Sequence, residues 1–326
     1  MGDVSLAISR YINEEIKLSM TDISNSATSR KWFLDRIQNK IAQQHNSPIL
    51  YASDPFVHFG SYFKGTKVKS VDEYDVLVVI DSNTGAYSKN NVNIGTGLGS
   101  ANPNYKYDQC FYKSDGTGIS PNKFLNWLKG ITLDIVNSFG GEAPERNGQA
   151  ITASIKSQNI KIDLVPCGIF RKNDGTIFYN IPKGDQGNGW IETAPHLDKQ
   201  RLDSASNTRN NLKNVIRLCK KIRDNYNFCV SSFAIETAVI DYSLTQTWHN
   251  NIYHDLYYSL NHLRSVFVSG VINDPYDFEN LIADVQSLDW YSKRISSILI
   301  KMMEASSAPS QQETYDIIRK AFENEQ

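Results

Sequence analysis

Residues 58–80 read HFGSYFKGTKVKSVDEYDVLVVI, and this segment decides the fold. Its second half contains Tyr74–Ile80, a short, largely β-branched apolar run bounded by polar residues, which is typical of a buried central strand. Its first half predicts a strand that ends at Gly60-Ser61 and enters a short turn of helix. The segment therefore predicts a strand, a Gly-Ser turn, a short helix and a buried strand, in that order.

The Gly-Ser turn is a candidate phosphate site. Gly60 permits close approach of the backbone, and Ser61 offers a hydroxyl and free N–H groups at the start of a helix. A Gly-Ser pair after a strand is also typical of an ordinary turn or helix cap. Taken alone, the pair does not decide between these two interpretations.

Three acidic residues are candidate metal ligands. Glu73 and Asp75 are two positions apart on one strand and so project from the same face, and Asp163 lies inside the apolar strand IKIDLVP. Carboxylates gathered in this way favour magnesium, which takes oxygen ligands. The alternatives are a solvated strand end for the first pair and an ion pair with Lys161 for Asp163.

The joint pattern of Gly-Ser, Glu-x-Asp and a later strand-borne Asp indicates nucleotidyl transfer. Two Mg²⁺ ions held by Glu73, Asp75 and Asp163, with Mn²⁺ as a substitute, would bind a triphosphate and lower the pKa of an attacking sugar hydroxyl. Asp163 would lie closest to that hydroxyl. We expect it to act first as a metal ligand.

Outward from this segment, helical periodicity predicts helices at 3–18, 29–44 and 120–140, the last with Ser120 as cap and Pro121 after it. Strands are predicted at 48–51, 57–59, 150–155 and 160–165, the last two forming a hairpin beside the Tyr74–Ile80 strand and ending at Pro166. A loop is expected at 183–195 and helices from about residue 203. Residues 82–117 are rich in Asn, Gly and Tyr and predict an irregular, mobile excursion near the active-site rim or on an adjacent surface.

Composition narrows the class of protein. The 326 residues are 40% hydrophobic and 21% charged with a net charge of -1, typical of a globular protein and without a global attraction to nucleic acid or anionic membranes. No apolar run reaches the length of a membrane span, and the acidic start is unlike a secretory signal, so we expect a cytosolic protein. The four cysteines lack a CxxC pair, which disfavours zinc and favours buried thiols.

The motifs resemble those of cyclic GMP-AMP synthase and its relatives, the CD-NTase superfamily, over most of the chain. The resemblance rests on Gly60-Ser61 with Glu73-Tyr-Asp75, the Ser120–Trp127 helix, Ile162–Pro166 and the step Ser231-Ser232-Phe233. It implies an α+β fold, with a polymerase-β-like nucleotidyltransferase core of mixed sheet and helices in 1–202 and a helical lobe in 203–326. The implied activity joins nucleoside triphosphates, ATP, GTP or others, into a cyclic di- or trinucleotide second messenger.

The resemblance also assigns roles to single residues. Gly60 and Ser61 match the phosphate motif, and the three acids match the metal triad. Lys220 matches a lysine that contacts the donor triphosphate, with Lys221 as the alternative alignment, while Ser232 matches a phosphate-contacting serine and Phe233 a ring that stacks on a base. The alternatives are that Lys220 lies over the lobe surface and that Phe233 belongs to the core.

The sequence departs from the animal DNA sensor of this superfamily because it lacks the cysteine spacing of that protein's zinc ribbon. Activation by duplex DNA is therefore disfavoured. A stand-alone unit resembles bacterial enzymes of anti-phage systems that work with a separate effector, and animal RNA-sensing receptors are an alternative. Two further alternatives are a linear-product nucleotidyltransferase, such as an oligoadenylate-type or RNA-tailing enzyme, and an inactive nucleotide-binding regulator.

Overall fold

The computed structural model describes residues 2–18, 20–44, 48–69, 74–81, 86–88, 91–93, 111, 114, 119–158, 160–171, 175–184, 189–276 and 279–325. The chain divides into two compact units. Unit 1 comprises Met1–Leu18, Lys64–Ser70 and Lys199–Gln326, and unit 2 comprises Ser19–Phe63 and Val71–Asp198. The first helix of the chain and the short segment after residue 63 therefore pack with the C-terminal helices.

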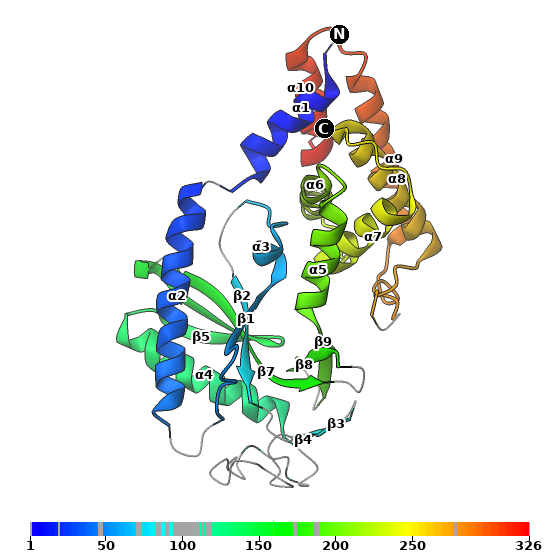
Figure 1. Cartoon of the computed structure of the whole chain (residues 1–326). Helices are drawn as coiled ribbons and strands as arrows, with labels where there is room; N and C mark the ends of the chain where they lie inside the picture. The colour runs from blue at the N-terminus through cyan, green and yellow to red at the C-terminus, as the bar shows by residue number, and fades with distance from the viewer. Residues whose placement is uncertain are drawn as a thin grey trace. The chain divides into compact units, whose positions relative to one another are not determined.

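Unit 2 is built on a mixed sheet (Figure 1). The strands are β1 Phe56–Phe59, β2 Tyr74–Ile80, β5 Glu142–Asn147, β6 Ala150–Ile155, β7 Ile160–Arg171, β8 Ile177–Pro182 and β9 Trp190–Thr193. They are ordered β1-β2-β7-β6-β5, and β8 pairs with the second half of β7 and with β9. β2 and β7 run parallel, whereas the other pairs in this sheet are antiparallel.

The alternation of side chains along β2 and β7 gives the sheet two different faces. On one face Val76, Val78 and Leu164 belong to a large apolar cluster with side chains of α2 Met20–Ala42 and α4 Pro121–Ser138. On the other face Leu77 and Val165 belong to a smaller cluster. The odd-numbered positions 75 and 163 precede these residues on that second face.

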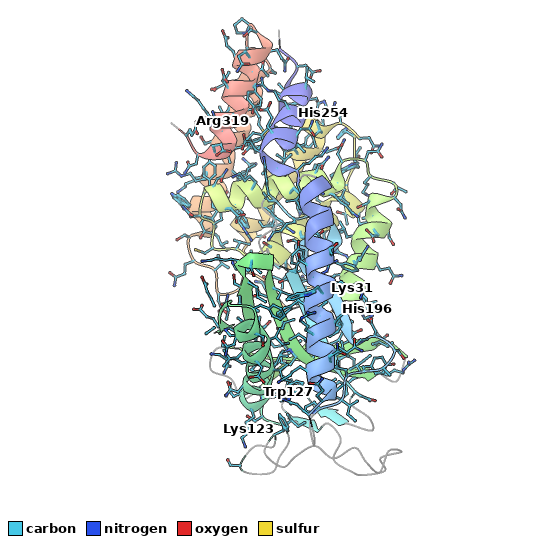
Figure 2. The ribbon with its side chains drawn as sticks, turned by 90° about the vertical axis from the view of Figure 1, so that its left-hand side faces the viewer. Lys31, Lys123, Trp127, His196, His254 and Arg319 are labelled. Carbon is cyan, nitrogen blue, oxygen red and sulfur yellow. The ribbon has the colours of Figure 1, made fainter. Side chains whose placement is uncertain are left out.

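Helix α4 begins at Pro121 with Ser120 as its cap, as predicted. The Ser120 side chain accepts a hydrogen bond from the Lys123 backbone N–H at 3.4 Å, and Pro121 occupies the first helical turn. Trp127, labelled in Figure 2, stacks on Phe124 with ring centroids 5.4 Å apart and donates its indole N–H to Gln44 at 3.3 Å. The apolar side of this helix packs in the large cluster of unit 2, and the Trp127 bond joins it to the segment just past the end of α2.

Unit 1 is helical and has a core of its own. Its helices are α1 Val4–Tyr11, the π-helical turn η1 Ile12–Ile16, α6 Leu212–Asn225, α7 Ser232–Thr245, α8 Ile252–Ser269, α9 Leu288–Ala305 and α10 Gln311–Glu323. Two shorter connections, α3 Gly60–Lys64 and α5 Pro195–Ser206, begin in unit 2 and end in unit 1. Within the described residues, none of the helices has the length and apolar character needed to span a membrane.

Three strand predictions are wrong in detail. The strand predicted to end at Pro166 continues to Arg171, because β7 exchanges its partner β6 for β8 between Leu164 and Gly168 and a proline is tolerated in that gap. β9 lies inside the predicted loop 183–195. The strand predicted at 48–51 is reduced to an isolated bridge between Leu50 and Ile80.

The 82–117 excursion lies mostly outside the described residues. The described parts include β3 Ala86–Ser88 and β4 Asn91–Asn93, which pair as an antiparallel two-stranded sheet. The expectation of a mobile excursion near the active site stays a prediction.

Candidate active site

Asp75 and Asp163 are direct neighbours across two parallel strands. In the register of β2 and β7, Asp75 is paired with Asp163. Residues paired in this way project from the same face, and adjacent strands are about 4.8 Å apart. Both residues are half-buried. The fold thus brings two carboxylates predicted from distant parts of the sequence to one place on the sheet.

A third strand contributes a hydroxyl beside them. Thr152 on β6 is paired with Asp163, and its Oγ1 donates a hydrogen bond to Asp163 Oδ1 at 2.6 Å. This contact restricts the rotation of the Asp163 carboxylate. Thr152 is not among the residues predicted from the sequence, although the predicted hairpin of β6 and β7 allows a hydroxyl residue next to Asp163.

Gly60 lies against the Asp75 carboxylate. β1 ends at Phe59, which is paired with Asp75, and Gly60 follows with φ +73°. A Cβ atom on Gly60 would lie 1.8 Å from Asp75 Oδ2. Only glycine fits here, because it tolerates the positive φ and leaves room for the carboxylate. Ser61 is the next residue of α3, so the Gly-Ser turn and Asp75 are adjacent in unit 2.

The donors of this site fit a magnesium ion. Carboxylate oxygens are the ligands that Mg²⁺ takes in proteins, and two of them share one face. Glu73, the third predicted ligand, lies outside the described residues. Within the described ranges, no group of three His, Cys, Asp or Glu residues forms a complete ligand set.

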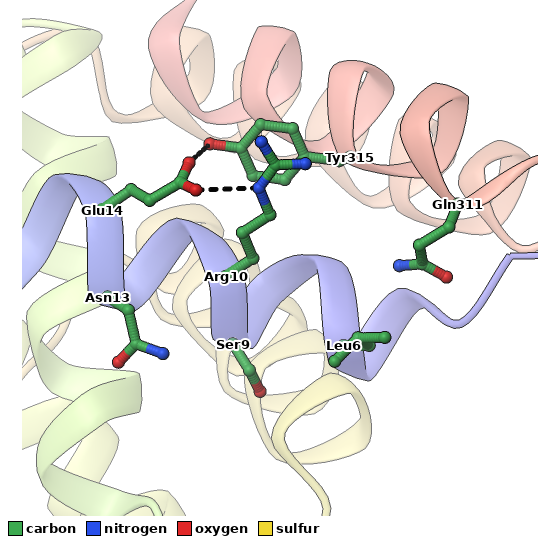
Figure 3. A pocket seen from close by; sticks show the side chains of 7 residues that line it. All are labelled: Leu6, Ser9, Arg10, Asn13, Glu14, Gln311 and Tyr315. Atoms are coloured by element: carbon green, nitrogen blue, oxygen red, sulfur yellow. Dashed lines mark hydrogen bonds and ion pairs between the residues drawn. The ribbon is translucent and has the colours of Figure 1, made fainter.

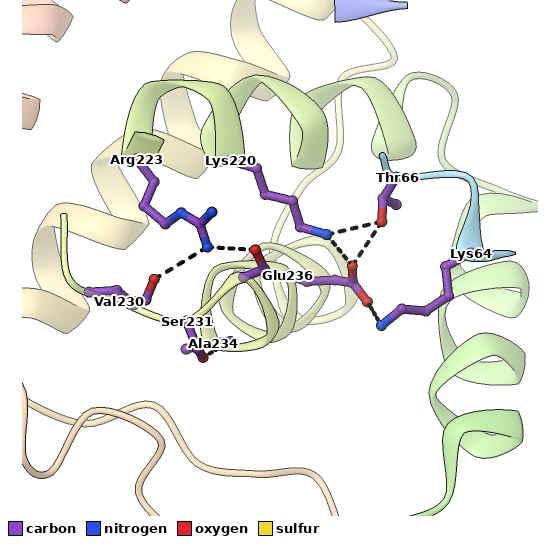
Figure 4. A network of polar contacts seen from close by, with 9 residues as sticks. Lys64, Thr66, Lys220, Arg223, Val230, Ser231, Ala234 and Glu236 are labelled. Atoms are coloured by element: carbon purple, nitrogen blue, oxygen red, sulfur yellow. Dashed lines mark hydrogen bonds and ion pairs between the residues drawn. The ribbon is translucent and has the colours of Figure 1, made fainter. Parts of the chain in front are cut away.

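The lobe residues predicted to bind nucleotide lie on two helices of unit 1: Lys220 is on α6 (Figure 4), and Ser232 and Phe233 are on α7. Lys220 is buried, not spread over the surface, and its ammonium donates to Glu236 Oε2 at 2.7 Å and to Thr66 Oγ1 at 3.0 Å. Ser232 accepts a hydrogen bond from Arg223 at 2.5 Å.

Phe233 is half-buried and outside the apolar core of unit 1. The Lys64 ammonium lies 5.6 Å from the centroid of its ring, which is within the range of a cation–π contact. The Phe233 ring is partly exposed and lies beside a cation, and such a ring is compatible with stacking on a nucleotide base. Its role as a base platform stays a prediction.

Unit 1 also carries a groove between α1 and α10 (Figure 3). The groove has a volume of about 430 Å³ and is lined by Leu6, Ser9, Arg10, Asn13, Glu14, Gln311 and Tyr315. Glu14 accepts hydrogen bonds from Arg10 at 2.8 Å and from Tyr315 at 2.6 Å. The charges of this groove are therefore paired with each other.

Known proteins resemble this chain in sequence and in structure. The chain is 25% identical over 290 residues, 88% of its length and 84% of the relative's, to a probable cyclic nucleotide synthase of Bacillus cereus (strain VD146). No family model matches the sequence. The solved structure of E. coli MS115-1 CdnC with ATP superposes with a TM-score of 0.69 at 15% identity, covering 98% of this chain and 97% of the other. The chain is thus similar over most of its length to a probable cyclic nucleotide synthase, and it shares the fold of CdnC.

A second CdnC structure, the CdnC:HORMA-deltaN complex from E. coli MS115-1, matches with the same TM-score, identity and coverage. These likenesses extend over nearly the whole chain. They confirm the expected CD-NTase fold, a mixed sheet with following helices.

Three residues beside Lys220 were missed at the level of sequence: Lys64, Thr66 and Glu236. Lys64 and Thr66 lie shortly after the Gly-Ser turn, and Glu236 is an acid within the apolar run 233–240 of helix α7. A buried acid in such a helix needs a cationic partner, which was the available signal.

Proposed function

We propose that this chain is a CD-NTase that joins nucleoside triphosphates into a cyclic di- or trinucleotide by metal-dependent phosphoryl transfer. The observation that carries the proposal is the register of Asp75 with Asp163, which puts two carboxylates side by side next to the Gly-Ser turn. The similarity to a probable cyclic nucleotide synthase of Bacillus cereus supports the cyclic product.

Asp75 and Asp163, together with Glu73, are the proposed magnesium ligands. Bound magnesium would neutralise the triphosphate and make a sugar hydroxyl easier to deprotonate. Asp163 is held by the Thr152 hydroxyl, so its carboxylate is oriented before substrate binds. Gly60 keeps the space beside Asp75 open, and Ser61 offers its hydroxyl to a phosphate.

The proposed nucleotide contacts on unit 1 are Lys220, Ser232 and Phe233. Lys220 would donate to a phosphate of the donor triphosphate, Ser232 would contact a phosphate, and Phe233 would stack on a base. ATP is one proposed substrate, in keeping with the structure of CdnC with ATP. A cyclic product also implies a downstream effector that recognises it, and anti-phage defence is the proposed setting.

The test is product analysis. The protein is incubated with all four labelled nucleoside triphosphates and magnesium or manganese, treated with phosphatase, and the resistant product is identified by mass spectrometry. We expect a cyclic oligonucleotide, which has no terminal phosphate to remove. A product that loses its terminal phosphates to phosphatase and is left as a linear oligonucleotide would identify a linear-product enzyme, and nucleotide binding without any product would identify an inactive regulator.

A further inference from the structure

Glu236 is the centre of a buried polar cluster in unit 1 (Figure 4). Its Oε1 accepts a hydrogen bond from the Lys64 ammonium. Its Oε2 accepts one from Lys220 at 2.7 Å and one from the Thr66 hydroxyl at 3.1 Å. The carboxylate is therefore bonded to two ammonium groups and a hydroxyl, and the residue is only 2% exposed.

The cluster carries more positive than negative charge. Lys64 and Lys220 are both buried, and in the described part of the chain Glu236 is the carboxylate that pairs with them. Arg223 is a further cation on α6, but it is paired with Asp224. Because a buried excess charge is costly, the cluster is suited to receive an anion.

The Lys220 ammonium has one more N–H donor than it has acceptors among the described residues. An ammonium group carries three N–H donors. Among the described residues, its acceptors are Glu236 and Thr66, on α7 and on the segment after α3. These two bonds fix the direction of the third N–H.

We propose that Glu236 is a positioning residue for nucleotide binding, which holds the Lys220 ammonium so that its third N–H meets a phosphate oxygen of the substrate triphosphate. This inference rests on the triphosphate-binding role proposed for Lys220. Thr66 assists as the second anchor of the same ammonium. Glu236 itself does not contact the nucleotide, so its effect passes through Lys220.

The charge of Lys220 depends on Glu236. Burial lowers the pKa of the Lys220 ammonium below its ordinary value, Glu236 opposes this, and the cations Lys64 and Arg223 add to the lowering. Burial alone would raise the pKa of the Glu236 carboxyl, but Lys220 and Lys64 hold it below its ordinary value. Removal of the carboxylate charge should therefore let Lys220 lose its proton at a lower pH.

The experiment measures the affinity of the full chain for a non-hydrolysable ATP analogue with magnesium at pH 6.5 and pH 8.5. In Glu236→Gln we expect binding at pH 8.5 to weaken at least about tenfold, the effect of one lost bond to a charged group, and to recover partly at pH 6.5. Thr66→Val removes one anchor of the Lys220 ammonium but keeps the Glu236 carboxylate. We therefore expect this variant to bind the analogue more weakly than the wild type, by the same factor at pH 6.5 and at pH 8.5.

A double-mutant cycle with Lys220→Met separates positioning from a general structural role. Glu236→Gln should have little further effect on affinity once Lys220 is replaced. Wild-type affinity of Glu236→Gln at pH 8.5, or an equal loss at both pH values that persists in the Lys220→Met background, would overturn the proposal. If Glu236→Gln does not fold, unchanged affinity in folded Thr66→Val would overturn it.

The experiment distinguishes a failure of this inference from a failure of the proposed cyclic-nucleotide synthesis. Because the measurement follows analogue binding, the Glu236 and Thr66 variants still report on Lys220 if the wild-type chain forms no product.

Discussion

Gly60→Ala tests the close approach between the Gly-Ser turn and the Asp75 carboxylate. The added Cβ would lie 1.8 Å from Asp75 Oδ2 and 2.6 Å from Asp75 Cγ, whereas real Cβ contacts begin near 3.0 Å. The carboxylate or the turn must therefore move by about 1 Å, a displacement that can cost on the order of 10²-fold in rate when a catalytic group is involved. The φ of +73° adds backbone strain of roughly 1–2 kcal/mol.

Gly140→Ala is the matched control. Gly140 has φ +65°, and a Cβ there would meet no atom within 4 Å, so this variant carries the backbone strain without the clash. We expect the melting temperature to fall in both variants, and further in Gly60→Ala because of the clash, but product formation, measured from labelled triphosphates, to be lost only in Gly60→Ala. Equal activity of the two variants at equal fold content would refute the assignment of Gly60 to the catalytic site.

Three further outcomes follow from the geometry. Asp163→Asn should abolish product while the melting temperature changes little, because an amide oxygen can still accept from Thr152; substantial turnover would remove Asp163 from the metal site. Phe233→Ala should weaken nucleotide binding by about 1–3 kcal/mol with little loss of stability, because the ring lies outside the core; a large melting loss with unchanged affinity would return it to a packing role. Burial, with a contribution from Arg30, lowers the pKa of His58 to about 4, so the folded protein keeps this ring neutral. The stability that His58 contributes above pH 6.5 should be lost as the pH falls from 6.5 towards 4, and His58→Asn should flatten that part of the pH profile of unfolding; an unchanged profile would contradict this.

The sequence predicted correctly those strands and helices that have a distinctive pattern within a few neighbouring residues. The strand Tyr74–Ile80 and the helix capped by Ser120 both form as predicted, since an apolar β-branched run and a Ser-Pro start act over a few residues. The neighbouring positions of Asp75 and Asp163 agree with the predicted arrangement of one strand beside a hairpin.

Other features depend on contacts that no local pattern encodes. The extension of β7 past Pro166 depends on β8 replacing β6 as its partner. The bond between Thr66 and Glu236 joins residues 170 positions apart, and a buried acid alone does not reveal its partner. The grouping of the first helix with unit 1 likewise follows from packing that is long-range in sequence.

The most direct test of the account compares the wild-type chain with Asp75→Asn in the formation of phosphatase-resistant label from α-labelled nucleoside triphosphates and magnesium. We predict a resistant cyclic product from the wild type and none from Asp75→Asn, with the two proteins melting at similar temperatures because the replaced carboxylate is needed for metal and not for packing. Equal amounts of resistant product from both proteins would contradict the assignment of Asp75 to the catalytic metal site.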